Sequence, residues 1–302
     1  MKILLIGYSN LAKKRIINFF KIRKIKFCVA SKSYKKKING AYEQFRSYRE
    51  GLINSKADLV YISLPNSLHY IWAKKALQMG YHVVVDKPIC RTYEELKNLI
   101  NLSKHKKKLL VEATFFNYHQ QIFNLIKYVK KNRINFLNSN FIIPKPKKGI
   151  LISKKLGGGI LMDMGPYISA VARIFSLKKL KSKIVIIKKD KRGLITSINF
   201  IFLFKNTIYT GCFMFGGSYK NELEVCLNDK SMKIERVFSP PENQSLYLDI
   251  NKKGDIKKIK IKKDNCFANF FSEIKLKVKS KNYSFYHKRI IDDFLFRYKF
   301  LK

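Results

Sequence analysis

Short apolar runs alternate with helical patterns along the first 112 residues of this 302-residue chain. Apolar residues recur at helical spacing over 11–20 and 67–80 and near 94–103. The apolar runs between them predict strands over 2–7, 25–31, 57–65, 81–88 and 108–113. Strands that are apolar on both faces and alternate with helices are typical of a parallel sheet with helices on each side. We therefore expect an α/β fold that begins with a Rossmann-type, doubly wound, dinucleotide-binding domain over residues 1–117.

After about residue 118 the pattern becomes mostly that of strands joined by polar turns. Strands are predicted over 134–143, 183–190, 195–204, 207–216, 221–229, 231–238, 245–250 and 255–263. Helical patterns appear near Gln120–Lys131, behind a glycine-rich segment at 157–159, and near Phe267–Val278 and Tyr286–Tyr298. This half of the chain predicts a C-terminal α+β domain over 118–302 with an open, mostly antiparallel sheet.

The net charge of +43 would attract nucleic acid, anionic membranes or phosphorylated small molecules. The lysines, however, are spread along the whole chain and accompany Ile, Asn, Phe and Tyr, the residues of A/T-rich codons. The chain also lacks the aromatic interleaving of a single-strand platform and the spacing of a helix-turn-helix or zinc finger. We expect no specific nucleic-acid partner; charge-driven nucleic-acid binding with a steep salt dependence remains a third hypothesis.

No apolar run reaches the roughly 18–20 residues that cross a bilayer, and the first apolar segment favours a strand over a signal peptide. The five cysteines are scattered and suggest neither a disulfide framework nor a metal site. We therefore expect a cytoplasmic protein with no membrane partner and no metal.

The stretch "IGYSNLA" occupies the turn between the first predicted strand and helix. It matches the dinucleotide-binding pattern G-x-G-x-x-G/A with Gly7, Ser9 in place of the second glycine, and Ala12. Serine is small, and its hydroxyl can donate to a phosphate oxygen. An ordinary strand–helix turn is the alternative explanation.

The end of the second predicted strand, "VASKS", indicates which cofactor binds. NAD-specific sites usually place an acid there for the ribose hydroxyls, and none is present. Ser31 and Lys32 can instead hold a 2′-phosphate, so NADP is expected, with NAD as the alternative. The competing interpretation is that Lys32 is one more lysine in a lysine-rich chain.

Lys87 follows the apolar run "VVVD" at the carboxyl end of a strand, where open α/β sheets bind their ligands. Pro88 pushes Lys87 toward an extended conformation at the strand exit. An ammonium there can polarise a carbonyl oxygen or bind the hydroxyl being oxidised. A surface lysine next to a loop is the alternative.

Asp163 and Tyr167 follow the three glycines of "LGGGILMDMGPY" and are four residues apart, so on one helix they would share a face. The glycines are expected to let the backbone pass close to cofactor and substrate. Tyrosine has a reference pKa near 10, and a neighbouring ammonium would favour its phenolate. Tyr167 is thus either a proton carrier or an aromatic residue at the edge of the core.

The stretch from 62 to 90 resembles the glucose-fructose oxidoreductase / inositol dehydrogenase / rhizopine catabolism (Gfo/Idh/MocA) family. The family pattern is approximately A/S-T-P-N-x-x-H, then A-x-x-A-L-x-x-G-K-H-V-x-x-E-K-P. The matching residues are Ser63, Pro65, Asn66, His69, Ala73, Ala76, Leu77, Gly80, His82, Val83, Asp86, Lys87 and Pro88. The chain departs at Leu64, usually Thr, and at Asp86, usually Glu. The resemblance continues into "VEATFFNYHQQ" and nearly spans the chain.

The resemblance implies site residues beyond those that the motifs suggest alone. Expected cofactor contacts are Gly7, Ser9, Asn10, Leu11, Ala12, Ser31, Lys32, Leu64, Pro65, Asn66, His69, Asp86 and Lys87. Asn117 stands at a usual Arg, and it and His119 are expected to bind substrate. Family members usually have an acid/base His at position 167, assisted by the Asp; a subgroup similar to dihydrodiol dehydrogenase and xylose dehydrogenase has Tyr there.

Our main hypothesis is an NAD(P)-dependent oxidoreductase acting at a carbinol or ketone carbon of a sugar, nucleotide-sugar or cyclic polyol. The resemblance extends to surface-polysaccharide enzymes. It implies that the C-terminal domain, 118–302, binds substrate and carries the contacts of a homo-oligomer, either a dimer or a tetramer. In this reading Lys87, Asp163 and Tyr167 are the catalytic residues. The alternative is a non-catalytic NAD(P)-binding regulatory protein on the same fold.

Overall fold

The computed structural model describes residues 1–32, 37–129, 132–281 and 283–301. The chain forms two compact units. The first comprises Met1–Ala113, Lys155–Gly157 and Phe271–Ile291. The second comprises Thr114–Lys154, Gly158–Phe270 and the chain from Asp292 onward.

This division differs from the expected domains 1–117 and 118–302, because two later segments belong to the first unit. Helix α8 (Cys266–Ser280) explains the larger of the two. The ring of its Phe271 lies 5.8 Å from that of Phe19, 5.1 Å from that of Phe20 and 5.9 Å from that of Tyr61. The apolar periodicity of α8 indicates that the helix has a buried face, but not which earlier residues bury it.

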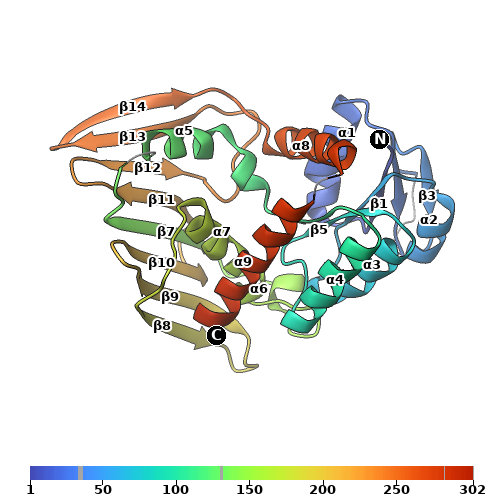
Figure 1. The fold of residues 1–302 in the computed structure, drawn as a ribbon, viewed down its shortest axis with the longest axis horizontal. Helices are drawn as coiled ribbons and strands as arrows, with labels where there is room; N and C mark the ends of the chain where they lie inside the picture. The colour runs from blue at the N-terminus through green and yellow to red at the C-terminus, as the bar shows by residue number, and fades with distance from the viewer. Residues whose placement is uncertain (33–36, 130–131, 282, 302) are drawn as a thin grey trace. The chain divides into compact units, whose positions relative to one another are not determined.

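The first unit contains a six-stranded parallel sheet in the order β3-β2-β1-β4-β5-β6 (Figure 1). Its strands are β1 (Ile3–Ile6), β2 (Phe27–Ala30), β3 (Glu43–Phe45), β4 (Leu59–Ile62), β5 (His82–Asp86) and β6 (Leu110–Ala113). All residues of β1, β2, β4 and β6 are buried, as their continuous apolar runs predict. This strand order is that of the dinucleotide-binding doubly wound fold, and it confirms the predicted fold class of the N-terminal half.

The helices of this unit follow the strands. They are a π-helical turn (Ala12–Ile16) continued by α1 (Ile17–Ile22), then α2 (Tyr48–Asn54), α3 (Asn66–Gln78) and α4 (Tyr93–His105), with residues 271–280 of α8 and 284–291 of α9 (Ser284–Phe300). The sequence reading missed β3 and α2. Strand β3 has three residues, of which only Phe45 is buried, and such a segment carries almost no periodic signal.

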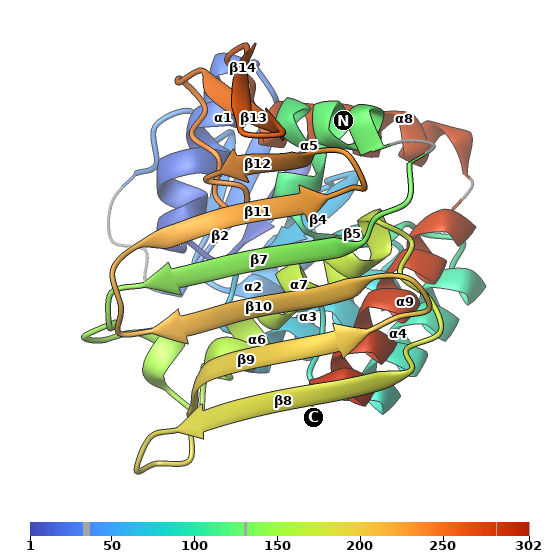
Figure 2. The ribbon, with the colours of Figure 1, turned by 90° about the vertical axis from the view of Figure 1, so that its left-hand side faces the viewer.

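The second unit is built on an eight-stranded sheet in the order β14-β13-β12-β11-β7-β10-β9-β8 (Figure 2). Its strands are β7 (Phe136–Ile143), β8 (Ser182–Lys189), β9 (Ile195–Leu203), β10 (Ile208–Phe215), β11 (Lys220–Cys226), β12 (Ser231–Glu235), β13 (Leu246–Lys252) and β14 (Asp255–Ile261). Only the pair β7–β10 is parallel. The expectation of an open, mostly antiparallel sheet is confirmed.

One face of this sheet packs against the unit's helices, as Figures 1 and 2 show for α5 (Gln120–Val129) and α7 (Gly165–Ile174). The predicted end of the first of these, Lys131, lies outside the described residues. Shorter helical segments are Phe115–Tyr118, Ile150–Ile152 and α6 (Ile160–Asp163). Among the described residues, no helix has both the length and the apolar character of a membrane span.

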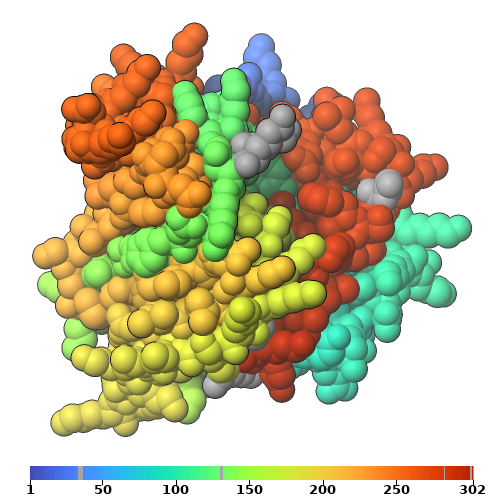
Figure 3. Space-filling model, turned by 60° about the vertical axis from the view of Figure 1, so that its left-hand side comes forward, coloured from blue at the N-terminus to red at the C-terminus, as the bar shows by residue number. Residues whose placement is uncertain are grey.

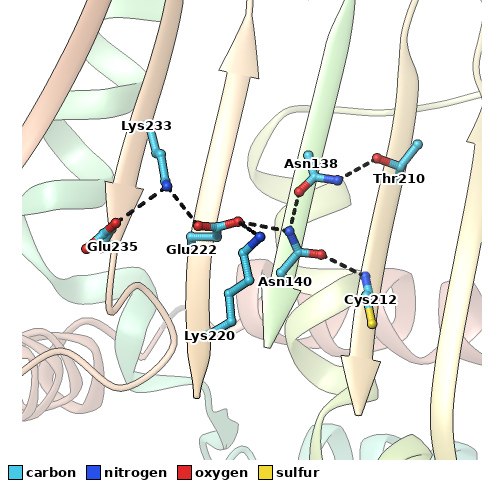
Figure 4. A network of polar contacts seen from close by, with 8 residues as sticks. All are labelled: Asn138, Asn140, Thr210, Cys212, Lys220, Glu222, Lys233 and Glu235. Atoms are coloured by element: carbon cyan, nitrogen blue, oxygen red, sulfur yellow. Dashed lines mark hydrogen bonds and ion pairs between the residues drawn. The ribbon is translucent and has the colours of Figure 1, made fainter. Parts of the chain in front are cut away.

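The other face of the sheet points outward, and Figure 3 shows its strands at the molecular surface. A polar network crosses it from β12 to β10 (Figure 4). The Glu222 carboxylate lies 2.9 Å from the Nζ atoms of both Lys220 and Lys233, and it accepts a hydrogen bond of 3.0 Å from Asn140. Burial opposes ionisation of Glu222, but these hydrogen bonds hold its pKa below the usual value.

Helix α7 is fixed to the last helix by a buried ion pair. Arg173 Nε lies 2.8 Å from Asp293 Oδ1, and the Asp293 side chain is only 4% exposed. Both residues belong to the second unit. Removing one partner of a buried pair leaves the other charge without compensation, which usually costs more than the pair itself contributes.

We predict that Asp293→Ala lowers the free energy of unfolding by about 3 kcal/mol. The double variant Arg173→Met/Asp293→Leu should recover part of this loss, because neither buried charge remains. Urea unfolding followed by circular dichroism measures both effects. Glu235→Ala removes the more exposed pair with Lys233 and should cost less than about 1 kcal/mol; equal losses in the two single variants would contradict the prediction.

Candidate functional site

The turn after β1 lies where the strand order of the first sheet reverses, between β2 and β4. Gly7 has φ +98°, and a Cβ there would lie 2.2 Å from the Ser63 carbonyl oxygen. Only glycine fits, and the β1 turn therefore packs directly on the end of β4. This is the role of the first glycine in a dinucleotide-binding turn, and ligands of open α/β sheets bind at this reversal point.

The helix after the turn begins at Asn10 and continues through Leu11 and Ala12. The first N–H groups of a helix have no partner within it and favour an anion. The helix start at Asn10 and Leu11 is therefore of the kind that can bind an anion, and their contact with a pyrophosphate stays a prediction. The Ser9 hydroxyl, in contrast, already accepts a hydrogen bond from Ala12 N (3.0 Å) and lies 2.7 Å from Ser63 Oγ.

The two residues expected at a 2′-phosphate differ in accessibility. Ser31 is buried, and its backbone N–H donates to the Phe45 carbonyl oxygen over 3.1 Å. Lys32 is exposed, with Nζ 5.7 Å from the centroid of the Tyr48 ring. Of the two, Lys32 is the side chain that can reach a phosphate. The rest of this loop, 33–36, lies outside the described residues.

His69 is completely buried and holds together the two loops that flank Lys87. Its Nδ1 lies 2.7 Å from the Pro88 carbonyl oxygen and its Nε2 lies 2.8 Å from that of Leu64. We expected His69 to contact the cofactor, but both ring nitrogens are engaged with backbone carbonyls inside the unit. Its role in this structure is to fix the ends of β4 and β5, including the cis Lys87–Pro88 peptide.

Asp86, the residue before Lys87, is the acceptor in a second cluster. Ser63 Oγ donates to Asp86 Oδ2 over 2.6 Å, and the Tyr61 hydroxyl donates to Asp86 Oδ1. Burial raises the pKa of Asp86, while these two hydrogen bonds and the neighbouring His69 and Lys87 oppose the rise. From the sequence we expected Asp86 at the cofactor and did not single out Tyr61, because a continuous apolar strand gives no sign that a tyrosine hydroxyl meets a carboxylate.

Asn66, also expected at the cofactor, ties down the start of the glycine-rich segment. Its amide donates to the Gly157 carbonyl oxygen over 2.8 Å, and Ser67 N donates to that of Leu156 over 3.2 Å. Gly157 has φ +78°. A Cβ on Gly158 would lie 2.3 Å from the Ile150 carbonyl oxygen. The close approaches that these glycines permit are to protein atoms.

Asp163 and Tyr167 both lie in the second unit. We had expected them on one continuous helix, but they lie on two. Asp163 ends α6, and α7 begins at Gly165. Pro166 has no backbone N–H to continue the helical hydrogen bonds, so the helix is interrupted at Met164. Tyr167 is half-buried among Phe116, Phe141 and Phe238, whose ring centroids lie 5.6, 5.7 and 5.0 Å from its own. These rings fix the plane of the Tyr167 ring.

Of the two expected substrate ligands, Asn117 lies in the Phe115–Tyr118 turn and His119 directly follows it. Asn117 donates to Thr114 Oγ1 over 2.8 Å, and His119 Nδ1 accepts from Gln121 N over 3.2 Å. Within the described parts of the chain, Asn117 Oδ1 and His119 Nε2 are buried and have no hydrogen-bond partner. Burial lowers the pKa of His119, although Asp264 opposes this. Unpartnered buried polar atoms mark a place where a ligand can bond.

The structure therefore brings the expected residues together in two groups. Lys87 lies with His69, Asp86, Ser63 and Ser9 in the first unit. Asp163, Tyr167, Asn117 and His119 belong to the second. Among the described residues, no three or more His, Cys, Asp or Glu side chains cluster in a way that would suit a metal ion.

Comparison with known proteins bears on this arrangement. A 3-reductase for dTDP-3,4-didehydro-2,6-dideoxy-alpha-D-glucose from Streptomyces antibioticus is 25% identical over 228 residues, 74% of this chain and 70% of that protein. An NADP-dependent D-xylose 1-dehydrogenase from Haloferax volcanii is 30% identical over 135 residues, 43% of this chain and 42% of its own length.

A solved 3-ketoreductase from Actinomadura kijaniata, in complex with NADP and TDP-benzene, has the same fold. It superposes with a TM-score of 0.87 at 20% identity and covers 97% of this chain and 94% of that one. Residues 1–114 match the oxidoreductase family with an NAD-binding Rossmann fold, the family that the motifs in this part of the chain resemble.

Proposed function

We propose that this protein is an NADP-dependent oxidoreductase that interconverts a carbinol and a ketone on a nucleotide-linked sugar. The observation that carries the proposal is the support built around Lys87 at the carboxyl end of β5. His69 binds the carbonyl of Pro88, directly after Lys87, and that of Leu64 beyond the end of β4, and Asp86 is the residue directly before Lys87. A lysine on a loop fixed in this way suits an oxygen on which charge develops.

In the proposed reaction the chain's own residues handle the proton. Lys87 polarises the oxygen of the reacting carbon, and Tyr167 gives or takes the hydroxyl proton. Asp163 orients Tyr167 or the substrate. The nicotinamide, when bound, supplies the hydride acceptor or donor.

The substrate class is argued from relatives and from the second unit. The Streptomyces relative acts on a dTDP-linked keto-sugar, and the Actinomadura structure holds TDP-benzene. Asn117 Oδ1 and His119 Nε2 are an acceptor and a donor suited to sugar hydroxyls. A buried polar atom that meets its partner only in the complex gives such a site selectivity for hydroxylated ligands.

NADP is the proposed cofactor because two lines of support agree. The end of β2 carries the exposed Lys32 and no acid, and both the Haloferax and Actinomadura proteins are named with NADP. The cofactor would be held by the Gly7 turn and the helix start at Asn10 and Leu11. A surface-polysaccharide role and a cytoplasmic location remain proposals; the five cysteines form no disulfide among the described residues, which is consistent with a reducing compartment.

A non-catalytic NADP-binding regulator is the second candidate. Such a regulator would need the β1 turn to bind NADP. It would not need a fixed Lys87, nor buried polar atoms such as Asn117 Oδ1 and His119 Nε2 that have no partner until a substrate binds. Bound NADPH with no substrate-dependent absorbance change across a panel of nucleotide-linked keto-sugars would favour it.

We further propose that the outer face of the second sheet binds a second copy of the chain. A solvated antiparallel sheet carries polar residues on its outer face. Here five outward residues at one end of the sheet are large and apolar: Ile184, Ile186, Ile201, Leu203 and Ile208 are 59%, 57%, 47%, 38% and 41% exposed. They are cross-strand neighbours on β8, β9 and β10, and the Glu222 network continues the same face.

Tyr167→Phe and Lys87→Ala should each lower kcat by at least about 100-fold, because each removes a group that acts on the reacting oxygen or its proton. The dissociation constant for NADPH should change by less than about threefold in both. Stopped-flow absorbance with a dTDP-linked keto-sugar and NADPH fluorescence titration measure the two quantities. Wild-type turnover in both variants would disprove the catalytic assignment.

Lys32→Ala should raise the dissociation constant of NADPH about tenfold, which corresponds to losing one charge-assisted contact, and leave that of NADH unchanged. Fluorescence titration with each cofactor measures this. Lys26→Ala removes the same charge elsewhere on the chain. If it weakens NADPH equally, the general positive field of the protein, and not Lys32, sets the preference.

Ile186→Glu should convert the proposed dimer to a monomer in sedimentation velocity experiments, because it places a charge in the apolar row. Ile22→Glu is the matched control, since Ile22 is 77% exposed in the first unit. A wild-type chain that sediments as a monomer at all concentrations would rule this interface out.

A further inference from the structure

A series of hydrogen bonds runs from the dinucleotide-binding turn to the carboxylate beside Lys87. Ala12 N lies 3.0 Å from Ser9 Oγ, Ser9 Oγ lies 2.7 Å from Ser63 Oγ, and Ser63 Oγ lies 2.6 Å from Asp86 Oδ2. Three segments that are far apart in the sequence are thus joined within the first unit. Ser63 is buried, so water does not replace its partners.

The direction of each hydrogen bond follows from whether each group can act as a donor or only as an acceptor. A backbone N–H only donates, and an ionised carboxylate only accepts. Ser63 has one hydroxyl proton, which it gives to Asp86. In the contact between the two hydroxyls, Ser9 must then be the donor. With Asp86 ionised, the Ser9 proton is committed to Ser63 and none is left for a phosphate oxygen.

The groups that face Asp86 all favour its ionised form. Tyr61, from β4, donates to the second carboxylate oxygen, and burial together with Asp86 raises the pKa of Tyr61 well above its usual value. Ser63, from the end of β4, donates to the first. His69, from α3, and Lys87 act on it as positive neighbours, against the burial that raises the pKa of Asp86.

His69 contributes position. Both of its ring nitrogens lie within hydrogen-bond distance of carbonyl oxygens, those of Pro88 and Leu64. One buried ring therefore joins the loop that contains Lys87 to the loop that follows Ser63.

We propose that Ser9, Ser63 and Asp86 are a positioning relay that holds an anion next to Lys87 and so keeps its ammonium form. The relay explains why serine stands at the second position of the turn, where glycine is the usual residue: Ser9 acts on the Lys87 loop and not on the pyrophosphate. Hydrogen bonds in series strengthen one another, so the turn and the Lys87 loop are coupled. The inference rests on the role proposed above for Lys87.

The test follows the ionisation of Lys87 without substrate. The rate of Lys87 acetylation by acetic anhydride is measured against pH by peptide mass spectrometry. Asp86→Asn should lower the midpoint by about one pH unit, because the ammonium loses its neighbouring anion. Ser63→Ala should lower it by a smaller amount. Tyr61→Phe, which keeps the ring that fills the core, should act in the same direction if Asp86→Asn does not fold.

Because Ser9 acts on Asp86 only through Ser63, the effects of the Ser9 and Ser63 variants should not add. Ser9→Ala alone should shift the midpoint slightly, and Ser9→Ala/Ser63→Ala should match Ser63→Ala, because the relay is already cut. Ser103→Ala is the control: it removes another buried hydroxyl in the same unit, one that donates to the Lys108 carbonyl oxygen over 2.6 Å. Its midpoint should equal that of the wild type.

NADPH titration separates the relay from a phosphate-binding serine. Ser9→Ala should leave the NADPH dissociation constant within about threefold of the wild-type value, whereas loss of a phosphate ligand would raise it about tenfold. A tenfold rise, or an unmoved Lys87 midpoint in both Asp86→Asn and Ser63→Ala, would overturn the inference. A wild type without reductase activity but with the predicted midpoint shifts would refute the proposed function and leave the relay standing.

Discussion

The conformation of the loops at the carboxyl ends of β4 and β5 depends on the hydrogen bonds of two buried polar side chains, Asp86 and His69. Transferring a carboxylate or an imidazole out of water is costly unless hydrogen bonds replace those of the solvent. Asp86 obtains its bonds from Tyr61 and Ser63, and His69 obtains its own from the Leu64 and Pro88 carbonyls. Every one of these partners lies at a strand end, so satisfying the polar groups also fixes the loops, and Lys87 is held where the loops place it.

The first unit therefore couples its cofactor turn and its ligand-binding edge through direct contacts. Gly7 has no side chain, which lets the turn touch the Ser63 carbonyl. Ser9, two residues further along the turn, contacts the side-chain hydroxyl of the same Ser63. In an ordinary Rossmann turn, close packing serves the approach of a pyrophosphate. Here the same closeness also connects the turn to the residue that precedes the proposed catalytic lysine.

The second unit fixes its candidate residues by packing. Tyr167 is held among three phenylalanine rings, and α7, which carries it, is anchored by the buried Arg173–Asp293 pair. One face of its sheet carries exposed side chains. These side chains are apolar at β8 and charged at β12. The net charge of +43, the most obvious property of the composition, explains none of these features.

The sequence by itself determined the parallel and antiparallel halves of the fold, the position of the dinucleotide turn, and the placement of Lys87 at a strand exit. These follow from periodicity and from residues adjacent in the chain, so local pattern is enough to find them. Tertiary structure alone decided that Ser9, Ser63, Tyr61 and Asp86 meet, that His69 and Asn66 support the loops, and that residues 271–291 join the first unit. Those contacts join positions tens to hundreds of residues apart, and which apolar faces or polar groups pair across such separations is set by packing of the whole chain.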